Sequence, residues 1–252
     1  MPILSRVPHI IFLYWIIKIA STTLGETGAD MFSMTFNIGY AGTILIFLAL
    51  FAVLATVKIA IKRYDPAVYW LTFTASAIAG TAISDFIDRT LGLGYAAGSL
   101  LLFILLAGAL SLWYAKTRAL SVENIDSAPA ETYYWLAFLI ANTLGTAAGD
   151  FLADDLQIGF MYSALIVGSI LAATALLHDV SNVSPVVLFW TAFVLTRPFG
   201  ATFGDLLTKP ADDGGLALGT VGASLIFTLM LGIALFFEIR REKAVVSIGN
   251  RA

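Results

Sequence analysis

Four aspartates recur at one position of an internal repeat, and their residue type suits them to chemistry in a membrane. Each lies fifteen residues after a tryptophan in an apolar stretch; the pairs are Trp15 and Asp30, Trp70 and Asp85, Trp135 and Asp150, and Trp190 and Asp205. Carboxylate oxygens are the ligands that hard divalent cations prefer. Clustered carboxylates also exchange protons, because each disfavours the ionised form of its neighbours. The pattern predicts an acidic site that trades a metal ion for protons.

Small residues accompany each aspartate at fixed places. The residue directly before the aspartate is alanine, serine or glycine, so the repeated unit is W-x9-G-x3-[GAS]-D. Small residues four positions apart allow membrane helices to approach one another closely. We therefore expect a set of glycines to pack helices and to draw the aspartates together: Gly25, Gly80, Gly145, Gly200, Gly149 and Gly204.

The composition indicates an integral membrane protein. The chain has 252 residues, of which 59% are hydrophobic and 12% are charged, whereas about a quarter of the residues in a soluble domain are charged. There is no cysteine, which excludes disulfides and thiolate metal sites. The lipid bilayer is the expected partner, and neither a cofactor nor a nucleic acid is expected.

Eight apolar runs have the roughly 20 residues that a membrane-spanning helix needs. They lie near 9–31, 38–59, 67–88, 94–115, 132–152, 159–178, 185–206 and 217–238. The sequence predicts one all-α membrane domain over 1–252, with eight transmembrane helices arranged as four helical-hairpin repeats. The repeats cover approximately 9–60, 66–116, 131–179 and 185–239. A linker at 116–130 separates two halves of two repeats each.

Lysine and arginine placement predicts the orientation. The termini and the loops between repeats carry ten of these residues, and the loops within repeats carry Arg89 and Lys209 alone. Since cytoplasmic loops are enriched in basic residues, both termini are predicted to be cytoplasmic. Two spans per repeat give all four repeats the same orientation, so an axis along the membrane normal can relate them.

The tryptophans lie near the predicted cytoplasmic boundary, where indole commonly anchors a helix at the interface. Anchoring is the favoured interpretation for Trp15, Trp70, Trp135 and Trp190, and a gate or stacking surface for a cation is the alternative. Lys18 lies close to this boundary and is expected to extend its ammonium group towards it.

Two further charges lie deep within the predicted spans. Glu26 precedes Asp30 by one helical turn, so the two carboxylates could bind a cation together. Arg197 must find a partner at membrane depth, and we expect that partner to be Asp205 or Asp150. Anion binding by Arg197 is the alternative.

The four tandem repeats, each with two membrane helices and one characteristic tryptophan, resemble a bacterial membrane-protein repeat family of unknown function. The matching residues are Trp15, Trp70, Trp135 and Trp190. The resemblance implies a multi-pass protein of the bacterial inner (plasma) membrane, without implying an activity.

The sequence carries no G-x-S-x-G, H-E-x-x-H or phosphate-loop motif, so an enzyme is not expected. It favours a secondary transporter that moves a cation, such as a divalent metal, outward against protons. Asp30, Asp85, Asp150 and Asp205 would be the transient metal ligands, with Glu26 assisting. The alternatives are a scaffold that binds a membrane partner, or an organic-solute transporter whose pocket is lined by Phe32, Phe86 and Phe151. A homo-oligomer is compatible with each of these functions.

Overall fold

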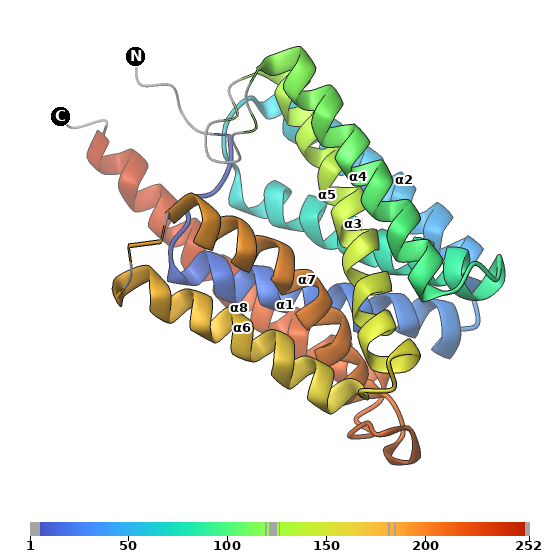
Figure 1. The fold of residues 1–252 in the computed structure, drawn as a ribbon. Helices are drawn as coiled ribbons and strands as arrows, with labels where there is room; N and C mark the ends of the chain where they lie inside the picture. The colour runs from blue at the N-terminus through green and yellow to red at the C-terminus, as the bar shows by residue number, and fades with distance from the viewer. Residues whose placement is uncertain are drawn as a thin grey trace.

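The computed structural model describes residues 6–118, 120, 125, 127–180, 182–183 and 185–249, and its long elements are all helices (Figure 1). The predicted linker lies partly outside these residues. The all-α prediction is confirmed over the described part of the chain. The long helices are α1 (Phe12–Asp30), α2 (Gly39–Ile61), α3 (Pro66–Asp85), α4 (Tyr95–Thr117), α5 (Ala128–Asp150), α6 (Phe160–Val180), α7 (Pro185–Thr208) and α8 (Thr220–Gly249).

The first helix of each repeat belongs to a closed inner ring. Helix α1 packs against α3, α3 against α5, α5 against α7, and α7 returns to α1. Burial separates these helices from the others: 78% of the apolar window of α3 is buried, against 22% for both α2 and α4. The four inner helices run in the same direction, because each is followed by a helix that returns.

The second helix of each repeat packs outside the ring against the following repeat. Helix α2 lies on α3, α4 on α5, α6 on α7, and α8 closes the circle on α1. The main contacts of an outer helix are therefore with the next repeat and not with its own, which corrects the picture of four self-contained hairpins. Because each outer helix packs on the inner helix of the next repeat, all four repeats form one unit.

The transition between the two helices of a repeat uses one glycine conformation. The residues that begin or precede the outer helices have φ between +74° and +78°; they are Gly39, Gly94, Gly159 and Gly219. A side chain would be strained at such φ values. Each inner helix can therefore turn into its outer helix in the same way, although the fourth loop is longer.

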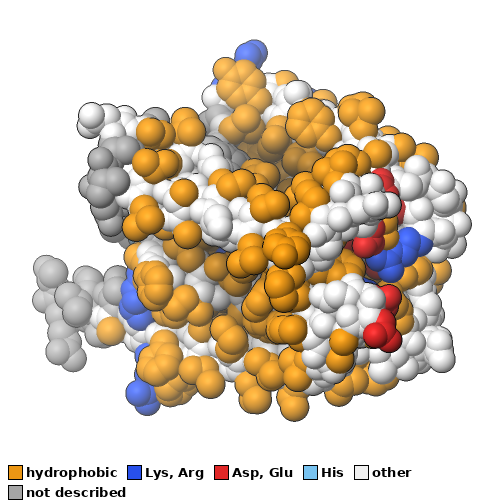
Figure 2. Space-filling view, turned by 60° about the horizontal axis from the view of Figure 1, so that its bottom comes forward, with side chains coloured by type: hydrophobic (Ala, Val, Ile, Leu, Met, Phe, Trp, Pro, Cys, Tyr) orange, Lys and Arg blue, Asp and Glu red, His pale blue; other side chains and the backbone are white. Residues whose placement is uncertain are grey.

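The surface suits a bilayer. Six helices in the described part of the chain are long and apolar enough to span a membrane. The face drawn in Figure 2 is largely hydrophobic, with its charged side chains gathered in a few places. Outer helices expose large apolar side chains such as Leu45, Phe103 and Leu225, each at least 60% exposed. The remaining helices, α1 and α7, belong to the inner ring and carry buried charges. These features indicate a multi-pass membrane protein.

Candidate functional site

The repeated glycines lie where neighbouring inner helices touch. In each repeat, the glycine five residues before the aspartate has no room for a side chain. A Cβ atom added there would lie 2.2–3.0 Å from a residue of the next repeat. The contacts follow one rule around the ring, and the last closes on the first: Gly25 with Ala77, Gly80 with Asn142, Gly145 with Arg197, and Gly200 with Thr22. Gly149 and Gly204 make similar approaches to Ala201 and Glu26. Closed packing at this level fixes which side chains face the ring axis.

The tryptophans also join neighbouring repeats. Each of the first three packs against an aromatic residue of the preceding repeat: Trp15 with Phe189 at 6.0 Å, Trp70 with Tyr14 at 5.5 Å, and Trp135 with Tyr69 at 5.2 Å between ring centroids. Trp70 and Trp135 are only 1% and 2% exposed, so interfacial anchoring in lipid is wrong for these two. The side chain of Trp190 lies outside the described part.

All four repeat aspartates are buried at the same end of the ring, and two basic residues pair them. The Arg89 guanidinium lies 3.3 Å from Asp85 and 3.7 Å from Asp150. The Lys209 ammonium lies 2.9 Å from Asp30 and 3.2 Å from Asp205. We call these six residues the aspartate layer. Arg89 and Lys209 follow their own aspartates by four residues, one helical turn, so each basic residue bridges its own repeat to the next.

The aspartates are close enough to influence one another. Each shared cation brings two of them together, Asp85 with Asp150 at Arg89 and Asp30 with Asp205 at Lys209. One oxygen each of Asp85, Asp150 and Asp205 is buried without a hydrogen bond, although it lies within ion-pair distance of Arg89 or Lys209. The contacts are therefore electrostatic and leave hydrogen-bonding capacity on three carboxylates.

Lys209 lies just beyond the end of α7, and opposing effects act on its charge. Burial lowers the pKa of Lys209, but Asp205 and then Asp30 raise it, and the net result is a pKa above its ordinary value. Lys209 therefore remains an ammonium group at physiological pH. The carboxylates of Asp30 and Asp205 keep a positive partner throughout that range.

The backbone changes form directly after three of the four aspartates. Five-residue π-helical turns follow at η1 (Met31–Thr35), η2 (Phe86–Thr90) and η3 (Phe151–Asp155). Single π turns are rare and are frequently found at functional sites. Helix α7 instead remains α-helical past Asp205 to Thr208, ahead of the short 3₁₀ turn η4 (Ala211–Asp213).

Four residues before the aspartates, a second polar layer spans the ring. Glu26, Thr81 and Thr146 occupy equivalent positions in the first three repeats, and Arg197 reaches in from one turn earlier in the fourth. Its guanidinium lies 3.3 Å from Glu26 and 2.6 Å from the Thr146 hydroxyl, and it also donates to Thr81. Both threonine hydroxyls donate to Glu26. We call these four residues the glutamate layer.

This layer corrects two expectations about charge pairing. The ion-pair partner of Arg197 is Glu26, and neither Asp205 nor Asp150 fills that role. Glu26 is committed to Arg197 and the two threonines, while the partner of Asp30 is Lys209. In the fourth repeat, the position four residues before the aspartate is the small residue Ala201. This leaves space in the layer, which the side chain of Arg197 fills from one turn earlier.

Lys18 does not extend to a boundary as expected. It is 2% exposed, and its ammonium group lies 3.0 Å from the ring centroid of Phe193 and 5.5 Å from those of Phe73 and Phe138. All four residues stand three positions after the tryptophan of their repeat. We call this set the lysine layer.

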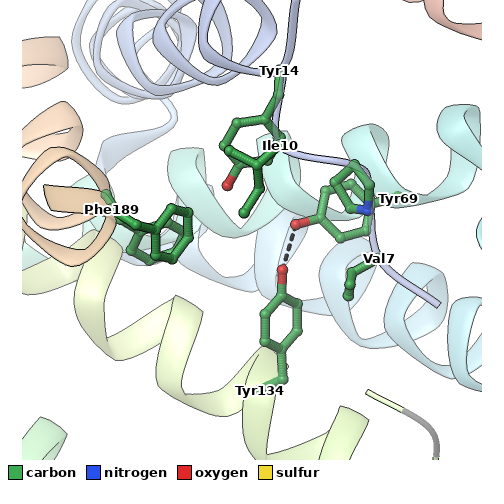
Figure 3. Close-up of a pocket in the computed structure, with 8 residues that line it drawn as sticks. Val7, Ile10, Tyr14, Tyr69, Tyr134 and Phe189 are labelled. Atoms are coloured by element: carbon green, nitrogen blue, oxygen red, sulfur yellow. Dashed lines mark hydrogen bonds between the residues drawn. The ribbon is translucent and has the colours of Figure 1, made fainter. Parts of the chain in front are cut away.

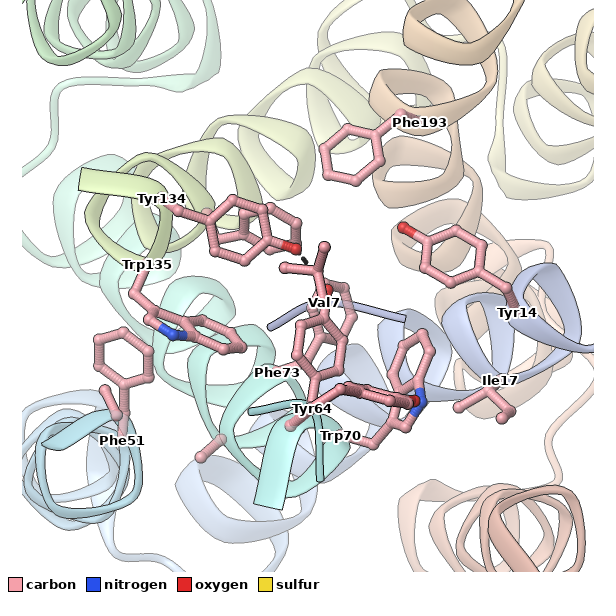
Figure 4. Close-up of a cluster of buried hydrophobic side chains, with 14 of the residues drawn as sticks. Val7, Tyr14, Ile17, Phe51, Tyr64, Trp70, Phe73, Tyr134, Trp135 and Phe193 are labelled. Atoms are coloured by element: carbon pink, nitrogen blue, oxygen red, sulfur yellow. Dashed lines mark hydrogen bonds between the residues drawn. The ribbon is translucent and has the colours of Figure 1, made fainter. Parts of the chain in front are cut away.

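Towards the tryptophan end, the residues before the tryptophans form a tyrosine layer: Tyr14, Tyr69, Tyr134 and Phe189. The Tyr69 and Tyr134 hydroxyls are hydrogen-bonded, and the layer lines a small cavity that Val7 and Ile10 cover (Figure 3). Figure 4 shows Val7 among side chains that converge from α1, α3, α5 and α7. The chain preceding α1 thus covers this end of the axis.

A buried ion cluster holds this covering segment, and sequence reasoning missed it. Glu131 accepts hydrogen bonds from Arg6 at 2.8 Å and from Lys58 at 2.7 Å. The three residues come from distant parts of the chain, so no sequence spacing indicated that they would meet.

The contacts of Phe32 differ from those of the polar layers. This predicted lining residue of a solute pocket packs with Phe36 and with Phe47 of α2. Among the described residues, no group of three or more histidine, aspartate or glutamate side chains is arranged to hold a metal ion. The aspartate layer is thus a set of ion pairs and not a preformed metal centre.

The repeat itself has a known family. The family described as "Repeat of Unknown Function (DUF347)" matches residues 13–64, 68–119, 133–183 and 188–244. The chain belongs to this family. No curated protein and no solved structure shows significant similarity to it. Each DUF347 unit joins one inner and one outer helix, so the unit repeated in sequence differs from the pair of helices that packs in space.

Proposed function

We propose that this protein is a secondary transporter that moves a cation along the axis of the inner ring in exchange for protons. One observation carries the proposal. Buried charged side chains from all four repeats lie inside the ring, in the lysine, glutamate and aspartate layers, while the outer helices present apolar surface. Ionisable groups within a membrane domain are costly and typically mark substrate or proton pathways.

Proton coupling is supported by the number and burial of the acidic groups. The aspartate layer has four carboxylates and two basic side chains, so two carboxylates exceed the internal cations. A bound cation or a proton can each reduce the repulsion in such a cluster. Competition between them for the same oxygens is the physical basis of exchange.

The pairing affects which cations suit the site. A divalent metal requires several oxygen ligands. Asp30 and Asp205 could supply them only by releasing Lys209. Asp85 and Asp150 could supply them only by releasing Arg89. A cation that replaces a single basic side chain requires less rearrangement. We retain a divalent metal such as manganese as one candidate substrate. Outward transport, eight membrane crossings, cytoplasmic termini and the bacterial inner membrane complete the proposal.

Proteoliposomes containing a pH-sensitive dye test this function. Addition of manganese across an imposed proton gradient should move protons across the membrane faster in vesicles with the parent protein than in protein-free vesicles. Asp150→Asn should reduce the rate at least about tenfold, as expected when an interaction worth about 1.4 kcal/mol or more is lost from the rate-limiting step. Asp154→Asn is the matched control, because Asp154 lies one turn later and is exposed.

The outcomes separate transport from the alternative of a scaffold. Equal rates for the parent, Asp150→Asn and protein-free vesicles would contradict transport. Together with co-purification of a fixed membrane partner, that result would favour the scaffold.

A further inference from the structure

In the lysine layer, the Lys18 nitrogen lies among three aromatic rings. Phe73, Phe138 and Phe193 come from three different inner helices and surround the Lys18 ammonium group at 5.5, 5.5 and 3.0 Å. Neighbouring rings contact one another, with centroids 5.4 Å apart for Phe73 and Phe138 and 5.0 Å apart for Phe138 and Phe193. The three rings and the ammonium group therefore form one box.

The occupant of this box has an unusual environment. Lys18 is 2% exposed, and no carboxylate in the described part of the chain forms an ion pair with it. The groups around its nitrogen are aromatic rings, whose quadrupoles attract cations within about 6 Å of a ring centroid. Elsewhere in the ring, Arg197, Arg89 and Lys209 each have an acidic partner. The box is thus the one described axial layer where a cation is held by aromatic rings.

The chemistry of the box selects a class of ligand. Hard metal ions require oxygen ligands, and three phenyl rings supply none. Alkylammonium and quaternary ammonium groups are weakly hydrated in comparison and are recognised by aromatic cages of this kind. A side-chain ammonium group is itself a tethered alkylammonium ion.

We propose that the lysine layer is a binding site for an organic ammonium cation, which Lys18 occupies in this structure, so that a substrate ammonium takes the place of the lysine during transport. As a substrate assignment, this inference rests on the proposed transport function. The binding site itself can be tested without transport.

The position of the box gives such a cation a route. On the tryptophan side it adjoins the small cavity of the tyrosine layer, and Phe193 lines both. Eight residues further along the inner helices, about 12 Å at 1.5 Å per residue, is the glutamate layer. An ammonium ion entering past Val7 would therefore meet the box before it meets a carboxylate.

Chemical rescue of Lys18→Ala tests the binding site in the purified full-length protein. Removing the propylammonium group beyond Cβ leaves the three rings with space for a small cation. Methylammonium chloride should raise the thermal unfolding midpoint of Lys18→Ala by about 5 °C, because a ligand that binds only the folded state stabilises it. Sodium chloride at equal concentration should not, and methylammonium should stabilise the parent protein much less, because Lys18 competes for the box.

Lys18→Ala/Phe138→Leu is the matched control, since it creates the same space without one wall of the box. It should lose most of the methylammonium response. An equal response in this double variant, or no response in Lys18→Ala, would overturn the proposal.

A second variant keeps the test decisive if Lys18→Ala does not fold. The chain has no cysteine, so Lys18→Cys has a single thiol. Aminoethyl methanethiosulfonate converts that thiol into a disulfide-linked ethylammonium with release of methanesulfinate, whereas the methyl reagent adds a neutral group. The ammonium product should unfold at a temperature about 2 °C above the methyl product. Equal midpoints after complete labelling would overturn the proposal.

Liposome uptake of radiolabelled methylammonium, counted as the excess over uptake by protein-free liposomes, separates this inference from the proposed function. Rescue without uptake of either methylammonium or manganese would support the box and contradict transport. Manganese transport without rescue or methylammonium uptake would support transport and contradict the ammonium site. Rescue and uptake together, with uptake reduced at least about tenfold in Phe138→Leu, are the expected results.

Discussion

The two ends of the inner ring use equivalent positions in opposite ways. At the aspartate end, all four repeats supply an acid, and basic residues from alternate repeats bridge them in two pairs. At the tryptophan end, aromatic rings fill three of the four equivalent places around Lys18. A backbone ring with four similar parts therefore carries basic residues from only two repeats at one end and a lysine from only one repeat at the other. Identical charges around a narrow axis repel one another, so the symmetry of the fold is broken by side chains.

The glutamate layer between the two ends gives the largest expected effect. Glu26→Gln leaves the Arg197 guanidinium buried without a countercharge, which should cost about 3–5 kcal/mol in the free energy of unfolding. A detergent titration of purified protein measures this change. Glu26→Gln/Arg197→Met should recover much of the loss, because the unpaired charge is then also removed. Parent-like stability of Glu26→Gln would show that the axial charges are not coupled as the contacts indicate.

Removing one lysine from each end compares the ends directly. Lys209→Met should destabilise the protein by about 2 kcal/mol, because it leaves Asp30 and Asp205 without their shared cation. Its side chain is partly exposed, which reduces the cost. Lys18→Met should change stability by less than about 1 kcal/mol, since methionine packs well against aromatic rings. The same titration measures both variants, and equal losses would break the contrast between the two ends.

The smallest effect concerns the close contact between α3 and α5 at Gly80, which lies between the two ends of the ring. In Gly80→Ala, the new Cβ would lie 3.0 Å from the backbone nitrogen of Thr143, and we expect a loss of about 1–2 kcal/mol from overpacking. Gly108→Ala is the matched control, because nothing lies within 4 Å of the position its Cβ would occupy. It should be neutral or stabilising by about 0.5–1 kcal/mol through helix propensity. The unfolding midpoint of each variant checks this prediction, and a similar loss at both positions would contradict it.

The sequence was sufficient to predict the helices and the presence of tightly packed glycines. Apolar runs of membrane length and the fixed spacing of Trp15, Gly25 and Asp30 identify a fourfold helical repeat, because helix formation in an apolar phase depends mainly on local sequence. The same spacing identified the aspartates as equivalent residues. Arg197 was recognised as a charge in need of a partner.

The partners themselves depended on the tertiary structure. Which repeat follows another around the ring, and how far a side chain reaches across it, decide that Arg197 meets Glu26 and that Arg89 and Lys209 bridge the aspartates. The sequence alone predicts a boundary position for Lys18, because its three phenylalanine neighbours are 55 to 175 residues away in the chain. Repetition along the sequence thus determined the elements and their equivalent positions. Only closure of the ring determined the electrostatic pairing, because that energy depends on distances between residues far apart in sequence.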